Sequence, residues 1–206
     1  MLLGTHCPHC AAVLKSLSEL VKQGVISQLH VANLDQVPEI AVEKGVRSVP
    51  WVQIGQFELA GLHSLAELRT WAERAGSEAG MTEYFEQRLG DGEVKQVLAM
   101  VERDPDLLHA LIGLIRNADA KINARLGAGV IMEEYEGRPE LLELVPALAE
   151  LTQHADPRVR SDACHNLSLT HDARVKKYIE PLLNDENAEV REVAEESLDE
   201  LNRFEA

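Results

Sequence analysis

The chain has 206 residues, of which 45% are apolar and 27% are charged, and its formal net charge is −15. This length suffices for one large domain or two small ones, each with its own core. An acidic surface of this kind repels nucleic acid and anionic lipid, so we expect neither a nucleic-acid partner nor a membrane partner.

Targeting signals and cysteine usage indicate a cellular compartment. No apolar run approaches the ~20 residues of a membrane span, and no secretory leader is recognisable. Three cysteines, two of them in one CxxC, do not resemble an extracellular disulfide framework, so we predict a cytoplasmic protein. Only six residues precede Cys7, few for a strand plus any leader, which leaves open a natural start codon further upstream.

The first 75 residues alternate between strand and helix patterns. MLLGT, at 1–5, predicts a short buried strand. From Pro8 the apolar residues fall on one helical face, and Gly24 is a typical helix stop. The segment 25–34, VISQLHVANL, is rich in β-branched and apolar residues and predicts a second strand.

The pattern then continues with a short helix, a hairpin and a third helix. Pro38 suits the first turn of a helix that runs to Lys44. WVQI and FELA flank Gly55-Gln56, which is the spacing of a tight hairpin. Ser64, with Glu67 three residues later, forms a capping box and opens the last helix of this half.

The CxxC motif stands where the first strand gives way to the first helix. Unpaired N–H groups and the partial positive charge of a helix N-terminus favour a thiolate over a thiol at Cys7. Cys10, one turn later, is close enough to form a disulfide with it, and Pro8 is tolerated in a first helical turn. A protonated His9 would be a second stabiliser of the Cys7 thiolate.

The surroundings of the motif resemble a known fold. In thioredoxin-type domains a CxxC lies between a strand and a helix, and a cis-proline lies directly before a hairpin; Pro50 stands at that second place. Residues 1–75 therefore resemble the thioredoxin superfamily in its short, glutaredoxin-like form. The Cys-Pro-His-Cys tetrapeptide is similar to that of bacterial periplasmic thiol oxidases. Gly61 alone stands where glutaredoxins carry Gly-Gly and an Asp, so a protein disulfide or dithiol is the expected substrate rather than glutathione.

This resemblance assigns roles to the site residues. It implies that Cys7 is the nucleophile and Cys10 the resolving thiol, assisted by the intervening Pro8 and His9. It also implies that Val49 and Pro50 contact the backbone of the substrate. His6 stands where thioredoxins carry a Trp, and we place it on the substrate side of the site. No cofactor or metal is implied.

Two other interpretations of the cysteines remain open. Two thiolates with His6 and His9 could bind zinc or copper, although no second CxxC or HxxxH pair exists to complete a structural zinc site. The pair could also be two inert buried thiols. The third cysteine, Cys164, aligns with Glu195 in the repeats described next, which predicts a position that leans toward solvent.

Residues 76–81 are a linker by composition, and beyond them every apolar pattern over 82–206 is helical. This half repeats: HADPRVRSDACHNL (154–167) aligns without a gap on DENAEVREVAEESL (185–198). A weaker copy lies 37 residues upstream, with Ile122, Leu126 and Val130 at the positions of Val159, Ala163 and Leu167. Helix pairs of this kind stack because one pair alone cannot cover its apolar face.

The repeats, at about 105–135, 140–170 and 172–204, resemble HEAT repeats. In that family a turn Asp and a following Arg typically form a ladder of polar contacts between stacked repeats. The resemblance gives these places to Asp156, Arg160 and Arg191, whereas the first copy has Asn123 where the Arg belongs.

The sequence thus predicts an α/β thioredoxin-like domain followed by an all-α, HEAT-like domain. We expect a thiol–disulfide oxidoreductase whose repeats dock a protein client. The alternative is a non-catalytic scaffold in which the CxxC is a redox sensor or a metal clip.

Overall fold

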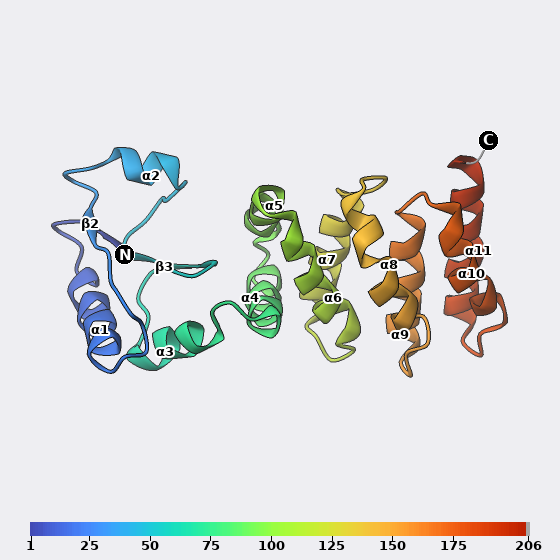
Figure 1. Ribbon diagram of the computed structural model, residues 1–206, viewed down its shortest axis with the longest axis horizontal. Helices are drawn as coiled ribbons and strands as arrows, with labels where there is room; N and C mark the ends of the chain where they lie inside the picture. Colours follow the sequence, from blue (N-terminus) through green and yellow to red (C-terminus); the bar gives the residue numbers. More distant parts are fainter. Residues whose placement is uncertain (205–206) are drawn as a thin grey trace. The chain divides into compact units, whose positions relative to one another are not determined.

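The computed structural model describes residues 1–204 (Figure 1). The chain divides into two compact units, Met1–Met81 and Thr82–Ala206. The first is a mixed α/β unit with a four-stranded sheet, and the second is helical throughout its described part. The predicted fold class is therefore confirmed for both halves.

The first unit contains a small sheet with strand order β2-β1-β3-β4. Strands β1 and β2 are parallel, whereas β1 pairs with β3, and β3 with β4, in antiparallel fashion. Helices α1 and α3 lie side by side on one side of the sheet and α2 lies on the other (Figure 1). The elements are β1 Leu2–Leu3, α1 Cys10–Lys22, β2 Ala32–Asn33, α2 Glu39–Glu43, β3 Trp51–Ile54, β4 Phe57–Ala60 and α3 Leu65–Arg74.

Local sequence signals explain most of these elements. Gly55, with φ of +58°, sits in the two-residue turn between β3 and β4. The Ser64 side chain accepts the backbone N–H of Glu67, whose carboxylate accepts the Ser64 N–H, so the predicted capping box opens α3. The core under the sheet includes Phe57 and Trp71, with ring centroids 4.9 Å apart.

The predicted strand over 25–34 is wrong for most of its length, because only Ala32–Asn33 is strand. The backbone N–H groups of Val25 and Ile26 donate to the carbonyl of Leu20 at the end of α1. These amides cap a helix and are not available to a sheet. β-branched composition alone did not reveal that competing use.

The predicted linker over 76–81 is also largely helix. Helix α4 covers Glu78–Gly90, and its start is capped by Ser77, whose hydroxyl accepts the backbone N–H of Gly80 at 3.0 Å. A serine before an acidic first turn is a helix start signal, and this outweighs the Gly-rich composition that indicated a linker.

The second unit consists of helices that pack in pairs: α6 with α7, α8 with α9, and α10 with α11. The second members, α7, α9 and α11, are neighbours in turn along one side of the stack. The remaining elements are α5 Val94–Arg103, η1 Pro105–Leu107, α6 Leu108–Arg116, α7 Ile122–Glu133, α8 Glu140–Leu151, α9 Pro157–Ser168, η2 Ala173–Val175, α10 Lys176–Ile179, η3 Glu180–Asn184 and α11 Ala188–Phe204.

The predicted register of the first repeat is wrong by two residues. Helix α7 begins at Ile122 and α9 begins at Pro157, 35 residues later, where the sequence had suggested 37. The buried face of α7 consists of Ala124, Gly127, Ala128, Ile131 and Met132. The offset of 37 places the larger apolar residues Ile122, Leu126 and Val130 in the core, but they are 73%, 64% and 45% exposed.

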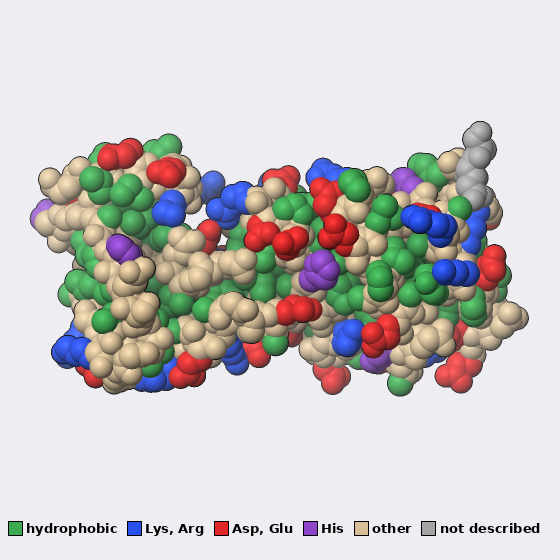
Figure 2. All heavy atoms as spheres, viewed as in Figure 1, with side chains coloured by type: hydrophobic (Ala, Val, Ile, Leu, Met, Phe, Trp, Pro, Cys, Tyr) green, Lys and Arg blue, Asp and Glu red, His purple; other side chains and the backbone are tan. Residues whose placement is uncertain are grey.

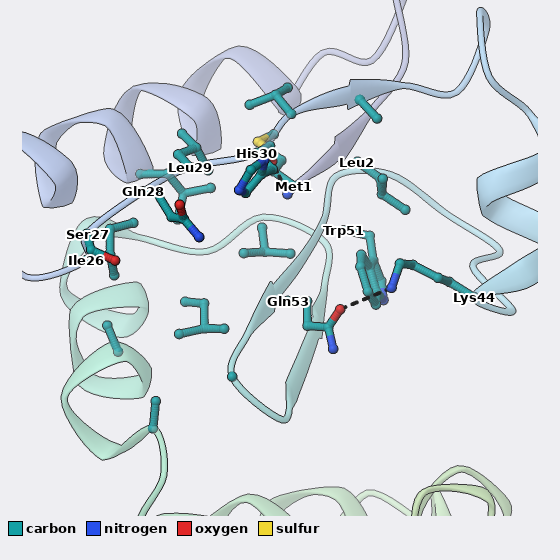
Figure 3. Close-up of a pocket in the computed structure, with 18 of the residues that line it drawn as sticks. Met1, Leu2, Ile26, Ser27, Gln28, Leu29, His30, Lys44, Trp51 and Gln53 are labelled. Carbon is teal, nitrogen blue, oxygen red and sulfur yellow. Dashed lines mark hydrogen bonds between the residues drawn. The ribbon is translucent and has the colours of Figure 1, made fainter. Parts of the chain in front are cut away.

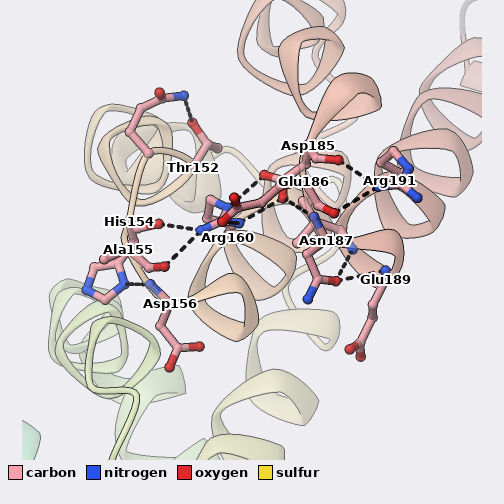
Figure 4. A network of polar contacts seen from close by, with 12 residues as sticks. Thr152, His154, Ala155, Asp156, Arg160, Asp185, Glu186, Asn187, Glu189 and Arg191 are labelled. Atoms are coloured by element: carbon pink, nitrogen blue, oxygen red, sulfur yellow. Dashed lines mark hydrogen bonds and ion pairs between the residues drawn. The ribbon is translucent and has the colours of Figure 1, made fainter.

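The polar link between the last two repeats centres on Arg160 (Figure 4). Its guanidinium donates to both carboxylate oxygens of Asp185, at 2.7 and 2.8 Å, and to the carbonyls of His154 and Ala155. Arg191 makes the equivalent carbonyl contacts one repeat later, with Asp185 and Glu186. The stack is therefore joined by a side-chain pair whose members lie 25 residues apart.

Contrary to the prediction, Asp156 does not take part in the link between the repeats. Its carboxylate accepts from the backbone and the guanidinium of Arg158, so it caps α9 within its own repeat. These hydrogen bonds lower the pKa of Asp156 to about 2. The carboxylate that accepts from Arg160 is instead that of Asp185, in the corresponding turn of the next repeat, which the alignment of the repeats did not indicate. With the corrected register, Arg125 and not Asn123 stands at the arginine position of the first repeat, and it pairs with Asp162.

Acidic side chains recur along the helical unit on the face that Figure 2 shows, among apolar and basic ones. This matches the sequence, in which residues 1–76 carry a net charge of −1 and the remainder −14. Among the described helices, none is long and apolar enough to cross a membrane.

Candidate functional site

The cysteine pair lies between β1 and α1, at the end of the first strand. Cys7 and Cys10 are joined by a disulfide, with Cα atoms 5.5 Å apart. Cys10 is the first residue of α1 and is buried, whereas Cys7 lies in the preceding turn and is half-buried. The helix begins two residues later than predicted, so Cys7 lies just before the helix terminus and not in its first turn. Cys7 is thus the more exposed residue of the pair.

The turn that carries Cys7 is held by the neighbouring strand. The Cys7 N–H donates to the carbonyl of Gly4 at 3.2 Å. The Thr5 N–H donates to Asp35 Oδ2 at 2.7 Å, and Asn33 Nδ2 donates to Thr5 Oγ1 at 3.0 Å. Because β1 and β2 are parallel, the segments that follow them meet at one edge of the sheet. The carboxylate of Asp35 therefore fixes the loop from which Cys7 projects.

Asp35 is the site residue that sequence reasoning missed. The hydrogen bonds from Thr5, followed by the charge of His6, hold the pKa of the Asp35 carboxyl below its ordinary value. The carboxylate is therefore ionised at neutral pH and remains an acceptor for the Thr5 N–H. A signal for this residue existed, because Asp35 follows the second strand much as Cys7 follows the first.

The Val49-Pro50 segment lies beside the same loop. The Val49–Pro50 peptide bond is cis, as the resemblance implied. A Cβ atom placed on Gly4 would lie 3.4 Å from Val49 Cγ2, so the two segments are in van der Waals contact range. Pro50 is buried and its carbonyl accepts the N–H of Gly61 at 2.8 Å, which ties the segment to the end of the hairpin.

The remaining predicted site residues surround the cysteines on the outside. Pro8, His9 and His6 are all exposed. Pro8 and His9 form the turn inside the disulfide loop, and the carbonyl of His9 accepts the N–H of Val13 in the first turn of α1. Exposed imidazoles thus lie on both sides of the half-buried Cys7.

A cluster of side chains that could hold a metal ion lies away from the cysteines. Within the described residues, one group of three or more His, Cys, Asp and Glu side chains has ligand atoms within 4.8 Å of one another. That group is Glu136, His171 and Glu200, in the helical unit. The histidines that flank the CxxC do not belong to it.

A cavity of about 670 Å³ lies elsewhere in the first unit (Figure 3). Its lining includes Met1, His30, Trp51 and Gln53, and Lys44 Nζ, also in the lining, donates to Gln53 Oε1 at 3.3 Å. Neither Cys7 nor Cys10 is among the described residues that line it. This cavity is therefore separate from the cysteine pair.

The third cysteine is buried, contrary to the prediction from its alignment with Glu195. Cys164 is fully buried on α9, and its thiol donates to Ser197 Oγ of α11 at 3.6 Å. Burial raises the pKa of the Cys164 thiol to about 11. Such a thiol is inert at neutral pH, which makes a redox partnership with Cys7 chemically unfavourable.

Comparisons with known proteins agree with this geometry. Residues 1–73 match the family model of a thioredoxin domain, and residues 108–199 match that of HEAT repeats. Searches of curated proteins and of solved structures gave no match. The chain thus joins a thioredoxin-like domain with a CxxC pair to a set of HEAT repeats.

Proposed function

We propose that this fusion of a thioredoxin-like domain with HEAT repeats is a thiol–disulfide oxidoreductase that acts on protein clients. The observation that carries the proposal is the difference in exposure within the cysteine pair. The half-buried Cys7 is accessible to a sulfur atom of another molecule, whereas the buried Cys10 can reach only Cys7. An attacking thiol and a resolving thiol need this asymmetry.

In the reducing direction, the Cys7 thiolate attacks one sulfur of a client disulfide. A mixed disulfide forms and the other client sulfur leaves as a thiolate, which takes up a proton. The Cys10 thiol loses its proton and attacks the Cys7 sulfur, which releases the client's second thiolate. The client gains two electrons, and the chain is left with the Cys7–Cys10 disulfide. The oxidising direction is the reverse, with a client dithiol as the electron donor.

The segments around the pair support a protein as substrate. Val49 and Pro50 lie next to the Cys7 loop and would contact the client backbone, with His6 and His9 at the rim. The residues next to Cys7, His6, Pro8 and His9, are exposed and could contact the surface of a protein client. The HEAT repeats supply a separate surface for protein interaction. The cytoplasmic location stays a prediction from cysteine usage.

The test is reduction of insulin by the chain in the presence of dithiothreitol. We expect turnover that falls to the uncatalysed rate with Cys7→Ser and is retained with Cys164→Ser, the matched control at the buried thiol. In a separate incubation of the reduced variant with insulin and without dithiothreitol, Cys10→Ala, which lacks the resolving thiol, should accumulate a mixed disulfide with insulin that gel electrophoresis without reductant detects. Equal rates of insulin reduction by the parent chain and by Cys7→Ser would contradict the proposal and favour the alternative of a non-catalytic scaffold.

A further inference from the structure

The exposed apolar residues of the helical unit are concentrated on one helix. Ile122, Leu126 and Val130 are spaced four residues apart on α7, so they form a single row about 12 Å long. They line a groove of about 740 Å³ between α7 and α9. An exposed row of large aliphatic side chains in a groove is typical of an interaction site.

A second groove, of about 380 Å³, continues from the first across α9 and α11. The two share Ser161, Asp162, His165 and Glu189 as lining residues, so they form one continuous groove. We call it the α7–α11 groove. Helices pack 8–10 Å apart, so the groove is roughly 20 Å long across its three helices.

The chemistry of the α7–α11 groove changes from one end to the other. The apolar end contains Arg125 and Arg158, but Arg125 pairs with Asp162 and Arg158 pairs with Asp156. The basic charges there are thus already compensated by neighbouring carboxylates. The α7 row therefore presents apolar surface and little net charge.

The other end is acidic. Glu189, Glu196 and Glu200 of α11 line it, and no Lys or Arg is among the described residues that do so. Glu189 and Glu196 are exposed, whereas Glu200 accepts a hydrogen bond from Ser168 Oγ at 2.9 Å. Three carboxylates on one helix face without a cation produce a negative field at this end of the groove.

We propose that the α7–α11 groove binds a segment of a partner protein that is apolar at one end and carries Lys or Arg at the other. The apolar end would cover the α7 row, and the basic end would face Glu189 and Glu196. A helix of roughly 13 residues would span the groove. A second copy of this chain is a poor occupant, because two molecules of net charge −15 repel each other. The inference rests on the docking part of the proposed function and not on its thiol chemistry.

The test measures binding of synthetic peptides to the full chain by fluorescence anisotropy. The probe is a 14-residue peptide with four leucines in one half and four lysines in the other. One control peptide has the same composition with the two residue types interleaved, and a second has glutamate in place of lysine. We expect the block peptide to bind at least tenfold more tightly than either control, and more weakly as salt is raised.

Variants of the chain locate the site. Leu126→Asp should weaken binding of the block peptide about tenfold, whereas Leu142→Asp, at an exposed leucine outside the groove, should not. Glu189→Lys with Glu196→Lys should weaken the lysine peptide and strengthen the glutamate peptide. Glu143→Lys with Glu180→Lys, an equal charge change at exposed positions outside the groove, should leave the preference intact. Because all these residues are exposed, the variants should keep the parent's circular dichroism spectrum.

Three outcomes would overturn the proposal: equal binding of the block and interleaved peptides, no effect of Leu126→Asp, or equal effects of the two charge reversals. A dimer in sedimentation that Leu126→Asp dissociates would make a second copy the occupant and would also overturn it. Because binding is measured without any thiol reaction, the result is independent of the insulin assay. Loss of turnover would leave the groove untouched, and loss of binding would leave the redox site untouched.

Discussion

Individual side chains in this protein differ sharply in how far their surroundings change their chemistry. Cys7 and Cys164 are both cysteines, yet one is half-exposed before a helix and the other is fully buried between two helices. Burial raises the pKa of Cys164 to about 11, and its only described polar contact is the hydroxyl of Ser197. The environment, and not the residue type, decides which sulfur can react.

This difference predicts the order in which the thiols react. After reduction of the disulfide, the native chain should release two equivalents of thionitrobenzoate rapidly from Ellman's reagent, one when Cys7 attacks the reagent and one when Cys10 displaces it from Cys7. The third equivalent, from Cys164, should follow slowly. Cys164 should react only after unfolding in guanidinium chloride, because its thiol is both enclosed and protonated at pH 8. Cys164→Ser should remove only the slow phase. Rapid labelling of three thiols in the native chain would contradict the buried position.

Arg160 and Arg158 lie two residues apart on α9, and they allow a buried ion pair to be compared with an exposed one. The Arg160 side chain is 8% exposed and pairs with an equally enclosed Asp185, whereas Arg158 is 56% exposed. Arg160→Gln leaves a buried carboxylate without its partner and should lower the free energy of unfolding by roughly 3 kcal/mol. Arg158→Gln should lower it far less, because solvent screens an ion pair at the surface. Chemical denaturation would measure both, and equal losses would contradict the role of the buried pair.

The same pair predicts a dependence on pH. The hydrogen bonds from Arg160 hold the pKa of Asp185 below its ordinary value of 3.8. A lowered carboxyl pKa gives stabilisation that is complete above the unfolded pKa and is lost as pH falls through the folded one. The difference between the parent chain and Arg160→Gln should therefore be constant above about pH 5 and shrink below about pH 4.

At the scale of helices, close packing depends on small residues at specific places. A Cβ atom on Gly113 of α6 would lie 2.5 Å from Oγ1 and 2.7 Å from Cγ2 of Thr82 on α4, so rotation of the threonine cannot relieve both contacts. Thr82 Oγ1 also donates to the carbonyl of Ala110. Gly129 on α7 has nothing within 4 Å of the same position.

Alanine at these two glycines should therefore have opposite effects. Gly129→Ala should raise the free energy of unfolding by roughly 0.5–1 kcal/mol, because alanine is the better helix former. Gly113→Ala brings the same gain in helix propensity but forces α4 and α6 apart. It should therefore lower the free energy of unfolding by roughly 1–3 kcal/mol. Thermal and chemical unfolding would test the signs, and a stabilising Gly113→Ala would contradict the close approach of the helices.

Elements with strong local signals were predictable from the sequence, and those that depend on distant partners were not. The capping box at Ser64 and the turn at Gly55 are determined by residues within a few positions of each other. The strand over 25–34 failed because its first amides bond to the carbonyl of Leu20 at the end of a helix. The register of α7 failed because small residues, Ala124 and Ala128, occupy the core while larger ones face the groove.

The candidate site shows the same difference between local and distant signals. The CxxC and Pro50 carry their signal in sequence motifs, and the structure brings their segments together. Asp35 was missed because its contact with Thr5 exists only through the parallel pairing of β1 with β2. Asp185 was missed because the carboxylate that Arg160 needs belongs to the next repeat.

The whole molecule divides its structural types and its charge between two units. Both tryptophans, Trp51 and Trp71, lie in the first unit, whereas most of the helices lie in the second, which also carries nearly all of the net charge. Tryptophan fluorescence therefore reports on the thioredoxin-like domain, and far-ultraviolet circular dichroism reports mainly on the HEAT repeats.

We expect the two probes to separate the unfolding of the units. Gly113→Ala should move the circular dichroism transition to lower denaturant concentration and leave the fluorescence transition in place, because compact units with their own cores unfold as separate cooperative units. A Trp71→Phe variant, in which Trp51 is the one remaining tryptophan, checks that the fluorescence transition reports on the first unit. Coincident shifts of both transitions in Gly113→Ala would show a single cooperative unit instead.

The link between Arg160 and Asp185 also bears on how such an array can grow. Arg191 repeats the carbonyl contacts of Arg160, 31 residues later, and within residues 1–204 no later turn supplies it with a carboxylate. A tandem duplication of one 31-residue segment that holds both Asp185 and Arg191 would give each new turn an acceptor for the arginine before it. Each new helix would in turn bring an arginine for its successor. A single genetic event could thus lengthen the stack without a further compensating substitution.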